Sequence, residues 1–131
     1  MLVGLISDTH GLVRPEIFSA LKGAELILHA GDVGGAFVLD ELRGIAPVYA
    51  VYGNTDAPGE AGLRASVAIE ILGRTIHVSH GHEVGSPTPE KLLNRYSADV
   101  LVFGHTHKPL IELSGTGLIV NPGAAGAKRF D

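Results

Sequence analysis

The first half of the chain alternates short apolar runs with amphipathic stretches. Apolar runs of the length of buried strands occupy residues 2–6, 25–29 and 48–52. Between them, residues 15–22 and 36–43 carry apolar side chains at helical spacing. The side chains expected to face the core from these two helices are Ile17, Phe18, Leu21, Phe37, Val38 and Leu42. This strand–helix order predicts parallel strands joined by right-handed crossovers.

The second half of the chain predicts a second sheet. Residues 67–72 and 75–79 flank a Gly73-Arg74 turn and are typical of a β-hairpin. Thr88 is expected to cap a short helix that directs Leu92, Leu93 and Tyr96 to the core. Further strands are expected at 99–103, 110–113 and 118–120, with a turn at 114–117. We therefore expect an α/β fold in which an early sheet faces a late one, with helices outside.

Composition and charge narrow the class of protein. With 131 residues, 45% of them hydrophobic, the chain is expected to form one domain over 1–131 with a substantial core. The absence of cysteine excludes disulfides and thiolate metal sites. A net charge of −4 argues against a basic nucleic-acid groove but not against a small phosphorylated substrate. The apolar start reads as a strand rather than a signal peptide, and no run is long enough to span a membrane. A cytoplasmic protein is expected.

Polar side chains that can bind metal follow most of the predicted strands. In chain order they are Asp8, His10, Asp32, Asn54, His80, His82, His105 and His107. Because the loops beyond the carboxyl ends of parallel strands share one edge of a sheet, we expect these side chains to converge. His105 and His107 lie two positions apart, so in an extended chain they would point to the same side.

The types of these side chains select a class of metal. Carboxylate, amide and imidazole groups without thiolate suit transition metals such as manganese, nickel, iron or zinc, rather than calcium. Seven or eight ligands are too many for one ion, so we expect two divalent transition-metal ions, with manganese preferred and Asp32 as a bridge. Two ions about 3.5–4 Å apart can hold a bridging hydroxide for in-line attack on phosphorus.

Five short motifs in this order resemble the calcineurin-like metallophosphoesterase superfamily. They are Asp8-Thr9-His10, Gly31-Asp32, Gly53-Asn54-Thr55-Asp56, His80-Gly81-His82 and Gly104-His105-Thr106-His107, and Asn121-Pro122-Gly123 also matches. The resemblance is greatest to the small single-domain branch, which includes phosphodiesterases and the scaffold subunit of the retromer coat. It implies a four-layer αββα sandwich of two facing mixed sheets with helices outside. It also implies two ligand sets: Asp8, His10, Asp32 and His107 for one ion, and Asp32, Asn54, His80 and His105 for the other.

The chain departs from the family pattern at Thr55, where many members carry a histidine that protonates the leaving group. General acid catalysis is worth about 10²–10⁴-fold, so its loss favours phosphodiesters or esters with good leaving groups as substrates. His82 is a candidate replacement acid, although its side chain can equally point away. Asp32, Asn54 and His82 are therefore the expected catalytic residues.

The leading prediction is a metal-dependent phosphodiesterase with a small phosphoester substrate. The alternative is a non-catalytic scaffold or interaction protein with the same fold, and a homo-oligomer fits either prediction. A Rossmann-type nucleotide-binding module is poorly supported, since the chain lacks a G-x-G-x-x-G motif. His29 and His77 are predicted to be structural, and Asp56 either orients a neighbour or forms a turn.

Overall fold

Three short parallel strands form the first sheet of the computed structural model, which describes residues 2–57, 63–114 and 117–125. The strands β1 (Val3–Ile6), β2 (Leu26–His29) and β3 (Val48–Ala50) lie in the order β1-β2-β3. Helices α1 (Pro15–Ala20) and α2 (Ala36–Arg43) connect them. All strand pairs described in this sheet are parallel, as crossover connections require.

The second sheet has five strands in the order β4-β5-β6-β8-β7. Its strands are β4 (Ser66–Ile71), β5 (Arg74–Ser79), β6 (Val100–Val102), β7 (Leu110–Ser114) and β8 (Gly117–Asn121). The two hairpins are antiparallel, whereas β5, β6 and β8 are parallel to one another. Of the two expected hairpin turns, the one at 114–117 includes residues 115 and 116, which lie outside the described residues.

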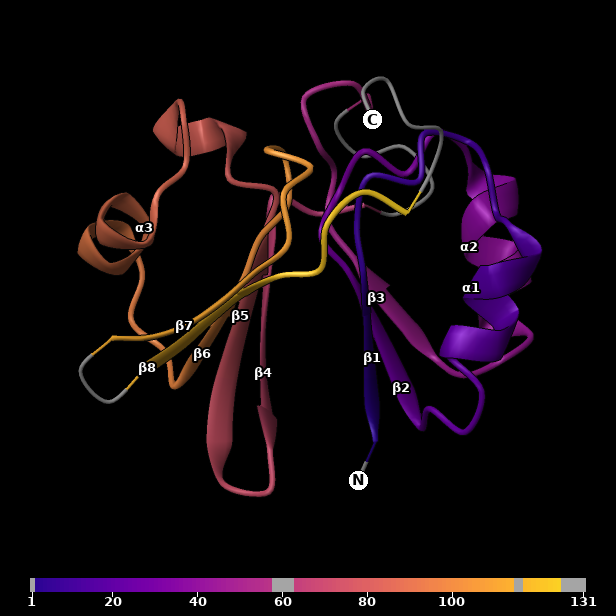
Figure 1. The fold of residues 1–131 in the computed structure, drawn as a ribbon, viewed down its shortest axis with the longest axis horizontal. Helices are drawn as coiled ribbons and strands as arrows, with labels where there is room; N and C mark the ends of the chain where they lie inside the picture. Colours follow the sequence, from indigo (N-terminus) through magenta and orange to yellow (C-terminus); the bar gives the residue numbers. More distant parts are fainter. Residues whose placement is uncertain (1, 58–62, 115–116, 126–131) are drawn as a thin grey trace.

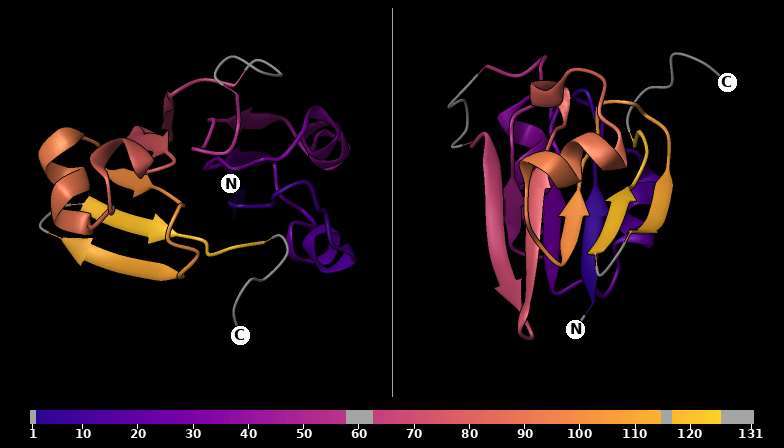
Figure 2. Two further views of the ribbon diagram at one scale, coloured as in Figure 1. Left: turned by 90° about the horizontal axis from the view of Figure 1, so that it is seen from above. Right: turned by 90° about the vertical axis from the view of Figure 1, so that its left-hand side faces the viewer.

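Between β5 and β6 the chain forms η2 (His82–Val84) and α3 (Pro89–Arg95). The hydroxyl of Thr88 accepts a hydrogen bond from Lys91 N at 3.2 Å, so the expected cap of α3 is confirmed. Figures 1 and 2 show α3 outside the five-stranded sheet, and α1 and α2 outside the three-stranded sheet. The four-layer αββα sandwich is therefore confirmed, with the correction that only the second sheet is mixed.

Three hydrophobic clusters fill the three spaces between the layers. Residues that alternate along β2 show the arrangement: Ile27 packs toward α1 and α2, whereas Leu26 and Leu28 pack toward the second sheet. The third cluster, around Leu92, joins α3 to β6 and β8. No helix in the described ranges is long and apolar enough to cross a membrane.

Two of the expected core residues are not in the core. Phe18 of α1 is 41% exposed and Phe37 of α2 is 51% exposed. The buried residues of α2 are Val38, Leu39 and Leu42, so the helix turns Leu39 inward in place of Phe37. Phe18 directly follows the buried Ile17, and Phe37 directly precedes the buried Val38. In such short helices, helical spacing alone did not distinguish the buried face from the exposed one.

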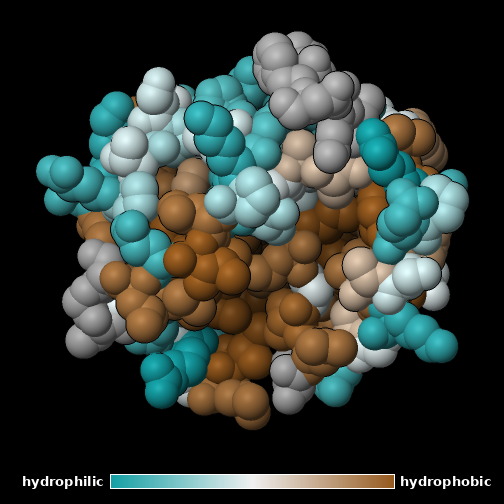
Figure 3. Space-filling model, viewed as in Figure 1, coloured by the Kyte–Doolittle hydropathy of each residue, from teal (hydrophilic) through white to brown (hydrophobic). Residues whose placement is uncertain are grey.

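The apolar character continues onto part of the surface. Figure 3 shows hydrophobic side chains across the middle of the face viewed in Figure 1, where β1, β7 and β8 lie. Ile111 and Leu113 of β7 are 78% and 79% exposed, and Leu2 before β1 is 56% exposed. Because β7 and β1 are both terminal strands of their sheets, this exposed apolar surface flanks two sheet edges.

Candidate metal centre

The loops after β1, β2, β3, β5 and β6 meet at one end of the sandwich, the upper end in Figure 1. Four of the predicted ligands there, Asp8, His10, Asp32 and His107, have ligand atoms that all lie within 4.8 Å of one another. His107 Nε2 lies 3.4 Å from Asp8 Oδ1 and 3.3 Å from His10 Nε2. These are the four residues that the family resemblance assigns to one ion.

The remaining predicted ligands lie beside this group. Asn54 Oδ1 lies 3.1 Å from His80 Nε2 and 3.2 Å from His105 Nδ1. Asp32 Oδ2 lies 3.3 Å from His80 Nε2 and 3.7 Å from His10 Nε2. The same oxygen of Asp32 thus faces both ligand sets, which is the position that a bridging carboxylate needs. The structure therefore brings all seven predicted ligands together, and metal binding by them stays a prediction.

Most of these ligands are held on unusual backbone. Six described residues other than glycine have φ in the left-handed region, and five of them are Asp8, His10, Asp32, His105 and His107, with φ of 49° to 70°. Aspartate and histidine tolerate this region better than most residues, yet such strain costs about 1–3 kcal/mol and persists where neighbours enforce it. Backbone hydrogen bonds of 2.9 Å from Asp8 N to Gly31 O and from His10 N to Asp32 O enforce it here.

This geometry corrects one premise drawn from the sequence. With φ of 70° and 63°, the chain at His105 and His107 is not extended. The two rings reach different partners: His105 directs Nδ1 to Asn54, whereas His107 directs Nε2 to Asp8. The segment therefore contacts both ligand sets.

His80 shows that the donor set fits a cation. Its Nδ1 lies 2.8 Å from the carbonyl oxygen of Ala30, an acceptor, so Nδ1 carries a proton. In neutral His80 the Nε2 lone pair would then face oxygen atoms of both Asn54 and Asp32. A proton on Nε2, or a bound cation, would remove the repulsion between this lone pair and the two oxygen atoms. Histidines that bind metal commonly donate their other N–H to a backbone carbonyl in this way.

Asp8 supports the same conclusion. Its Oδ2 accepts hydrogen bonds from Ser7 Oγ and from His105 N. Its Oδ1 is buried and has no hydrogen-bond partner in the described part of the chain. Burying a carboxylate oxygen without a hydrogen-bond donor costs folding free energy, and a bound cation would offset that cost.

Charges and hydrogen bonds shift the titration of the site. Burial would raise the pKa of Asp32, but hydrogen bonds from His80 and Thr55 outweigh it and hold that pKa well below its ordinary value. Burial would lower the pKa of His80, but the hydrogen bond and charge of Asp32 raise it above its ordinary value. Burial, aided by nearby His80, lowers the pKa of His105. A cation entering between Asp32 and His80 must displace a proton, so acid is expected to weaken metal binding.

Several residues that do not face the site hold its loops. Asp56 accepts hydrogen bonds from Val33 N, Gly34 N and Gly53 N, at 2.9 to 3.0 Å, and so ties the loop after β3 to the loop after β2. Asp56 N also donates to Gly53 O at 3.2 Å, so both roles left open for Asp56, orienting neighbours and forming a turn, are confirmed. The side chain of Asn121 donates to Gly104 O at 3.1 Å and to Thr106 Oγ1 at 3.0 Å.

His29 is a buried structural histidine, as predicted. Gly31 N donates to its Nδ1 at 3.1 Å, so Nε2 carries the proton and donates to Thr9 Oγ1 at 3.0 Å. Thr9 in turn donates to Val33 O at 2.7 Å. Burial lowers the pKa of His29 to about 4. The sequence offered no signal for the roles of Ser7 and Thr9, because both depend on contacts across loops.

Two glycines are required by close approach rather than by backbone conformation. A Cβ atom on Gly53 would overlap the carboxylate of Asp32, and one on Gly104 would overlap Ser7 Oγ and the carboxylate of Asp8. Neither glycine has a positive φ. The glycines that precede Asn54 and His105 therefore leave room for the two carboxylates.

His82 lies next to the ligands without joining them through a hydrogen bond. Its ring centroid is 5.4 Å from that of His80 and 6.4 Å from that of His105. Its Nδ1 is buried without a hydrogen-bond partner among the described residues, and the nearest charged oxygen, of Glu83, is 3.9 Å away. Its role as a proton donor stays a prediction.

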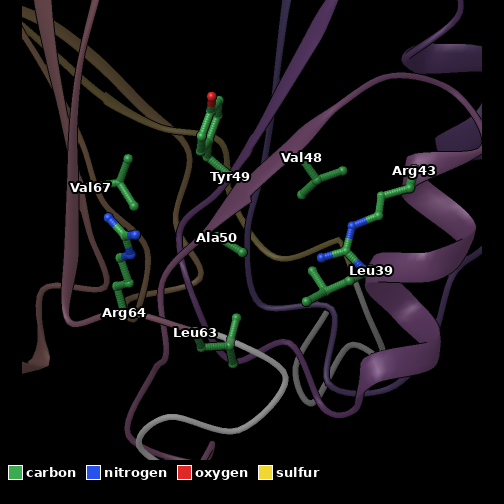
Figure 4. Close-up of a pocket in the computed structure, with 8 residues that line it drawn as sticks. All are labelled: Leu39, Arg43, Val48, Tyr49, Ala50, Leu63, Arg64 and Val67. Atoms are coloured by element: carbon green, nitrogen blue, oxygen red, sulfur yellow. The ribbon is translucent and has the colours of Figure 1, made fainter.

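A pocket of about 210 Å³ lies elsewhere, beside α2 and β3, and its lining includes no predicted ligand. Figure 4 shows Arg43 of α2 and Arg64 on opposite sides of Ala50 in this pocket. The candidate metal centre and this pocket therefore share no predicted ligand.

Known proteins resemble the chain over nearly its whole length. A model described as the calcineurin-like phosphoesterase superfamily domain matches residues 1–131. A probable metallophosphoesterase of Methanothermobacter thermautotrophicus is 38% identical over 140 residues, which cover 99% of this chain and 80% of the relative. The phosphodiesterase YfcE of Escherichia coli strain K12 is 32% identical over 150 residues, which cover 94% of this chain and 78% of YfcE.

Solved structures of Vps29 from Entamoeba histolytica share the fold. A single mutant matches with a TM-score of 0.85 and 31% identity, covering 99% of this chain and 78% of Vps29. The wild-type protein complexed with Zn²⁺ matches with a TM-score of 0.82 and 32% identity, covering 95% and 75%. With its motifs, its sandwich of two sheets and its clustered aspartates and histidines, the chain belongs to the calcineurin-like phosphoesterase superfamily.

Proposed function

We propose that the protein is a metal-dependent phosphoesterase that hydrolyses phosphodiesters. The observation that carries the proposal is the convergence of Asp8, His10, Asp32 and His107 within 4.8 Å, with Asp8 Oδ1 buried and without a hydrogen-bond partner in the part of the chain described. Relatives named metallophosphoesterase and phosphodiesterase support it.

Two divalent ions are the proposed cofactors. The ligand sets would be Asp8, His10, Asp32 and His107 for one ion, and Asp32, Asn54, His80 and His105 for the other. When bound, the ions would supply a bridging hydroxide and neutralise charge on the phosphoryl oxygens. Manganese is preferred and nickel, iron or zinc are alternatives, since this donor set suits all four. The zinc complex of Vps29 shows that one relative binds such an ion.

The chain itself would position the ester and supply a proton. Asp32 is fixed by a hydrogen bond of 3.0 Å from Thr55 N to its Oδ1, which leaves Oδ2 for both ligand sets. His82 would donate a proton to the leaving oxygen, in place of the histidine that many relatives carry at the position of Thr55. Because this donor lies outside the motif position, diesters with good leaving groups are the proposed substrates.

The test is an assay of purified protein on a bis-aryl phosphodiester with added Mn²⁺. The wild-type protein should show metal-dependent turnover, and Asp32→Ala should abolish it. Asp40→Ala is the matched control, because Asp40 lies on α2 with a side chain that is 72% exposed. An absence of turnover in the wild type, or equal turnover in the wild type and Asp32→Ala, would contradict the proposal.

A second candidate function is an interaction protein with the same fold. It is favoured by the exposed Ile111 and Leu113 on the terminal strand β7. If the protein self-associates through this surface, replacing both residues by serine should convert a dimer to a monomer in sedimentation experiments. A wild-type protein that is monomeric at all concentrations would contradict self-association.

A further inference from the structure

A second pocket, of about 290 Å³, lies beside the candidate metal centre. Four segments build it: the residue Tyr52 after β3, the start of β4, η2 and the end of α3. The side chains that line it include Tyr52, Ser66, His82, Glu83, Arg95 and Tyr96. Its size is at the lower end of small-molecule sites, so it suits part of a substrate rather than a whole polymer.

This pocket adjoins the predicted ligands through His82. The His82 ring is 5.4 Å from the ring of His80, and Tyr52 continues the same wall with its ring centroid 6.2 Å from that of His82. Tyr52 also precedes the predicted ligand Asn54 by two residues. A group attached to a phosphorus atom at the ligands would therefore have this pocket next to it.

One aromatic wall of the pocket, Tyr96, is held firmly by its neighbours. The hydroxyl of Tyr96 donates to Glu83 Oε2 at 2.6 Å, and Glu83 Oε1 accepts from Gly81 N at 3.0 Å. The ring of His77 stacks on that of Tyr96, with centroids 4.0 Å apart. Both carboxylate oxygens of Glu83 are thus engaged by the chain, and Tyr96 is fixed before any ligand arrives.

Arg95 is the cation of the pocket, and it is available. Its guanidinium lies 5.7 Å from the centre of the Tyr96 ring and makes no ion pair or hydrogen bond with the residues that the structure describes. A guanidinium in this state can stack on a planar ring or donate to acceptor atoms of a ligand. Together with the rings of Tyr52 and His82, it offers stacking surfaces and hydrogen-bond donors, which an alkyl group would not use.

We infer that this pocket binds one ester substituent of the substrate, and that this substituent is a nucleoside. Planar bases stack on tyrosine, histidine and arginine side chains, and their ring nitrogens and carbonyl oxygens accept hydrogen bonds. The inference rests on the proposed phosphodiesterase function and narrows its substrates to nucleotide diesters.

The test compares two diesters that share a p-nitrophenyl leaving group, one with a thymidine 5′-ester and one with a methyl ester. The kcat/KM of the wild type with Mn²⁺ should be about tenfold higher or more for the thymidine ester. Tyr52→Leu and Arg95→Gln should each lower this ratio about threefold to tenfold. Tyr49→Phe and Arg43→Gln are matched controls in the other pocket and should keep the wild-type ratio.

The outcomes separate the two proposals. If the wild type hydrolyses neither diester, the proposed function fails. If it hydrolyses both without preferring the thymidine ester, or if Arg95→Gln keeps the preference, the inference about the pocket fails while the function stands. Arg95 is exposed at the end of α3, so this variant is expected to fold.

Binding provides a readout that does not need turnover. In saturation-transfer NMR with the metal-free protein and thymidine 5′-phosphate, the base protons should receive saturation from the wild type and less from Tyr52→Leu. Ribose 5-phosphate should give a weaker response. Equal responses for the two ligands, or no loss in the variant, would overturn the inference.

Discussion

The two ligand sets of the candidate metal centre are held in place by different means. In the first set Asp8, His10 and His107 stand on left-handed backbone, and hydrogen bonds between the first two loops enforce it at Asp8 and His10. In the other set His105 also has a left-handed φ of 70°, but Asn54 and His80 have ordinary φ values and lie close together, with His80 Nε2 3.1 Å from Asn54 Oδ1. Asp32 belongs to both arrangements.

This difference predicts how the metal affinity of each ligand set should respond to substitutions. The first set depends on strained turns, so changes in residues that brace the loops should disturb it most. The second set shares one strained turn, at His105, but it depends also on His80, which is completely buried and whose Nδ1 lies 2.8 Å from Ala30 O. Disturbing the loops should therefore cost the first ion more than the second.

The largest effect is expected where the two sets meet. Asp32→Asn keeps the shape of the side chain but removes the charge that faces His10 and His80. Both ions should be lost together, and activity should fall by about a thousandfold or more, because metal stabilisation of the transition state is worth several kcal/mol. Elemental analysis of metal per chain checks the prediction. Retention of one full ion would show that Asp32 does not bridge.

The next effect separates the sets from one another. His107→Ala should release the ion of the first set, since His107 faces Asp8, whereas His105→Ala should release the ion of the second, since His105 faces Asn54. Titration of the metal-free variants with Mn²⁺ should show one tight site remaining in each. Equal loss of both ions in both variants would contradict the division.

A smaller effect is expected from Asn121, whose side chain makes no hydrogen bond to a predicted ligand in the part of the chain that the structure describes. Its amide holds Gly104 and Thr106, on either side of His105. Asn121→Ala should weaken metal affinity about 10–100-fold, the usual cost of losing a residue that orients a ligand. Isothermal titration with Mn²⁺ measures it. Asn94→Ala, at an exposed position of α3, is the control and should bind like the wild type.

The smallest effect concerns stability rather than metal. His29 is fully buried, and burial lowers its pKa to about 4 from 6.5. Between these values the unfolded chain binds a proton that the folded chain excludes, so the stabilisation from neutral His29 is present above pH 6.5 and is lost as pH falls toward 4. In the metal-free protein, the free energy of unfolding should therefore fall by about 2 kcal/mol between pH 7 and pH 5.

Urea unfolding of the metal-free protein at both pH values measures this loss. His29→Gln should show a shallower decline, because glutamine does not titrate. His29 also braces Thr9 between Asp8 and His10, so the same variant should weaken the first ion more than the second. An unchanged pH dependence in His29→Gln would show that other groups cause the decline.

Local patterns were reliable where residues act through the backbone. The hairpin of β4 and β5, the cap at Thr88 and the placement of ligands after strands were all predicted, since each depends on neighbours in the chain. The hairpin turn was placed one residue too late, because Arg74 pairs with Ile71 as part of β5 and the turn is Leu72-Gly73. Phe18 and Phe37 were assigned wrongly to the core, because in helices of six and eight residues the packing partner selects the buried face.

The sequence by itself determined the αββα architecture, the order of the ligands and the family. The strands, the helices and two facing sheets follow from the hydrophobic period, which is a local property, whereas the four-layer sandwich and the family follow from the resemblance of the motifs in their order. The resemblance already assigned His105 and His107 to different ions and Asp32 to both. Only the tertiary structure decided that left-handed turns direct these two rings to Asn54 and Asp8, that Oδ2 of Asp32 faces both sets, and that Arg95 adjoins His82 in one pocket. These facts depend on left-handed turns and on contacts across loops, and such contacts form only when distant segments pack together.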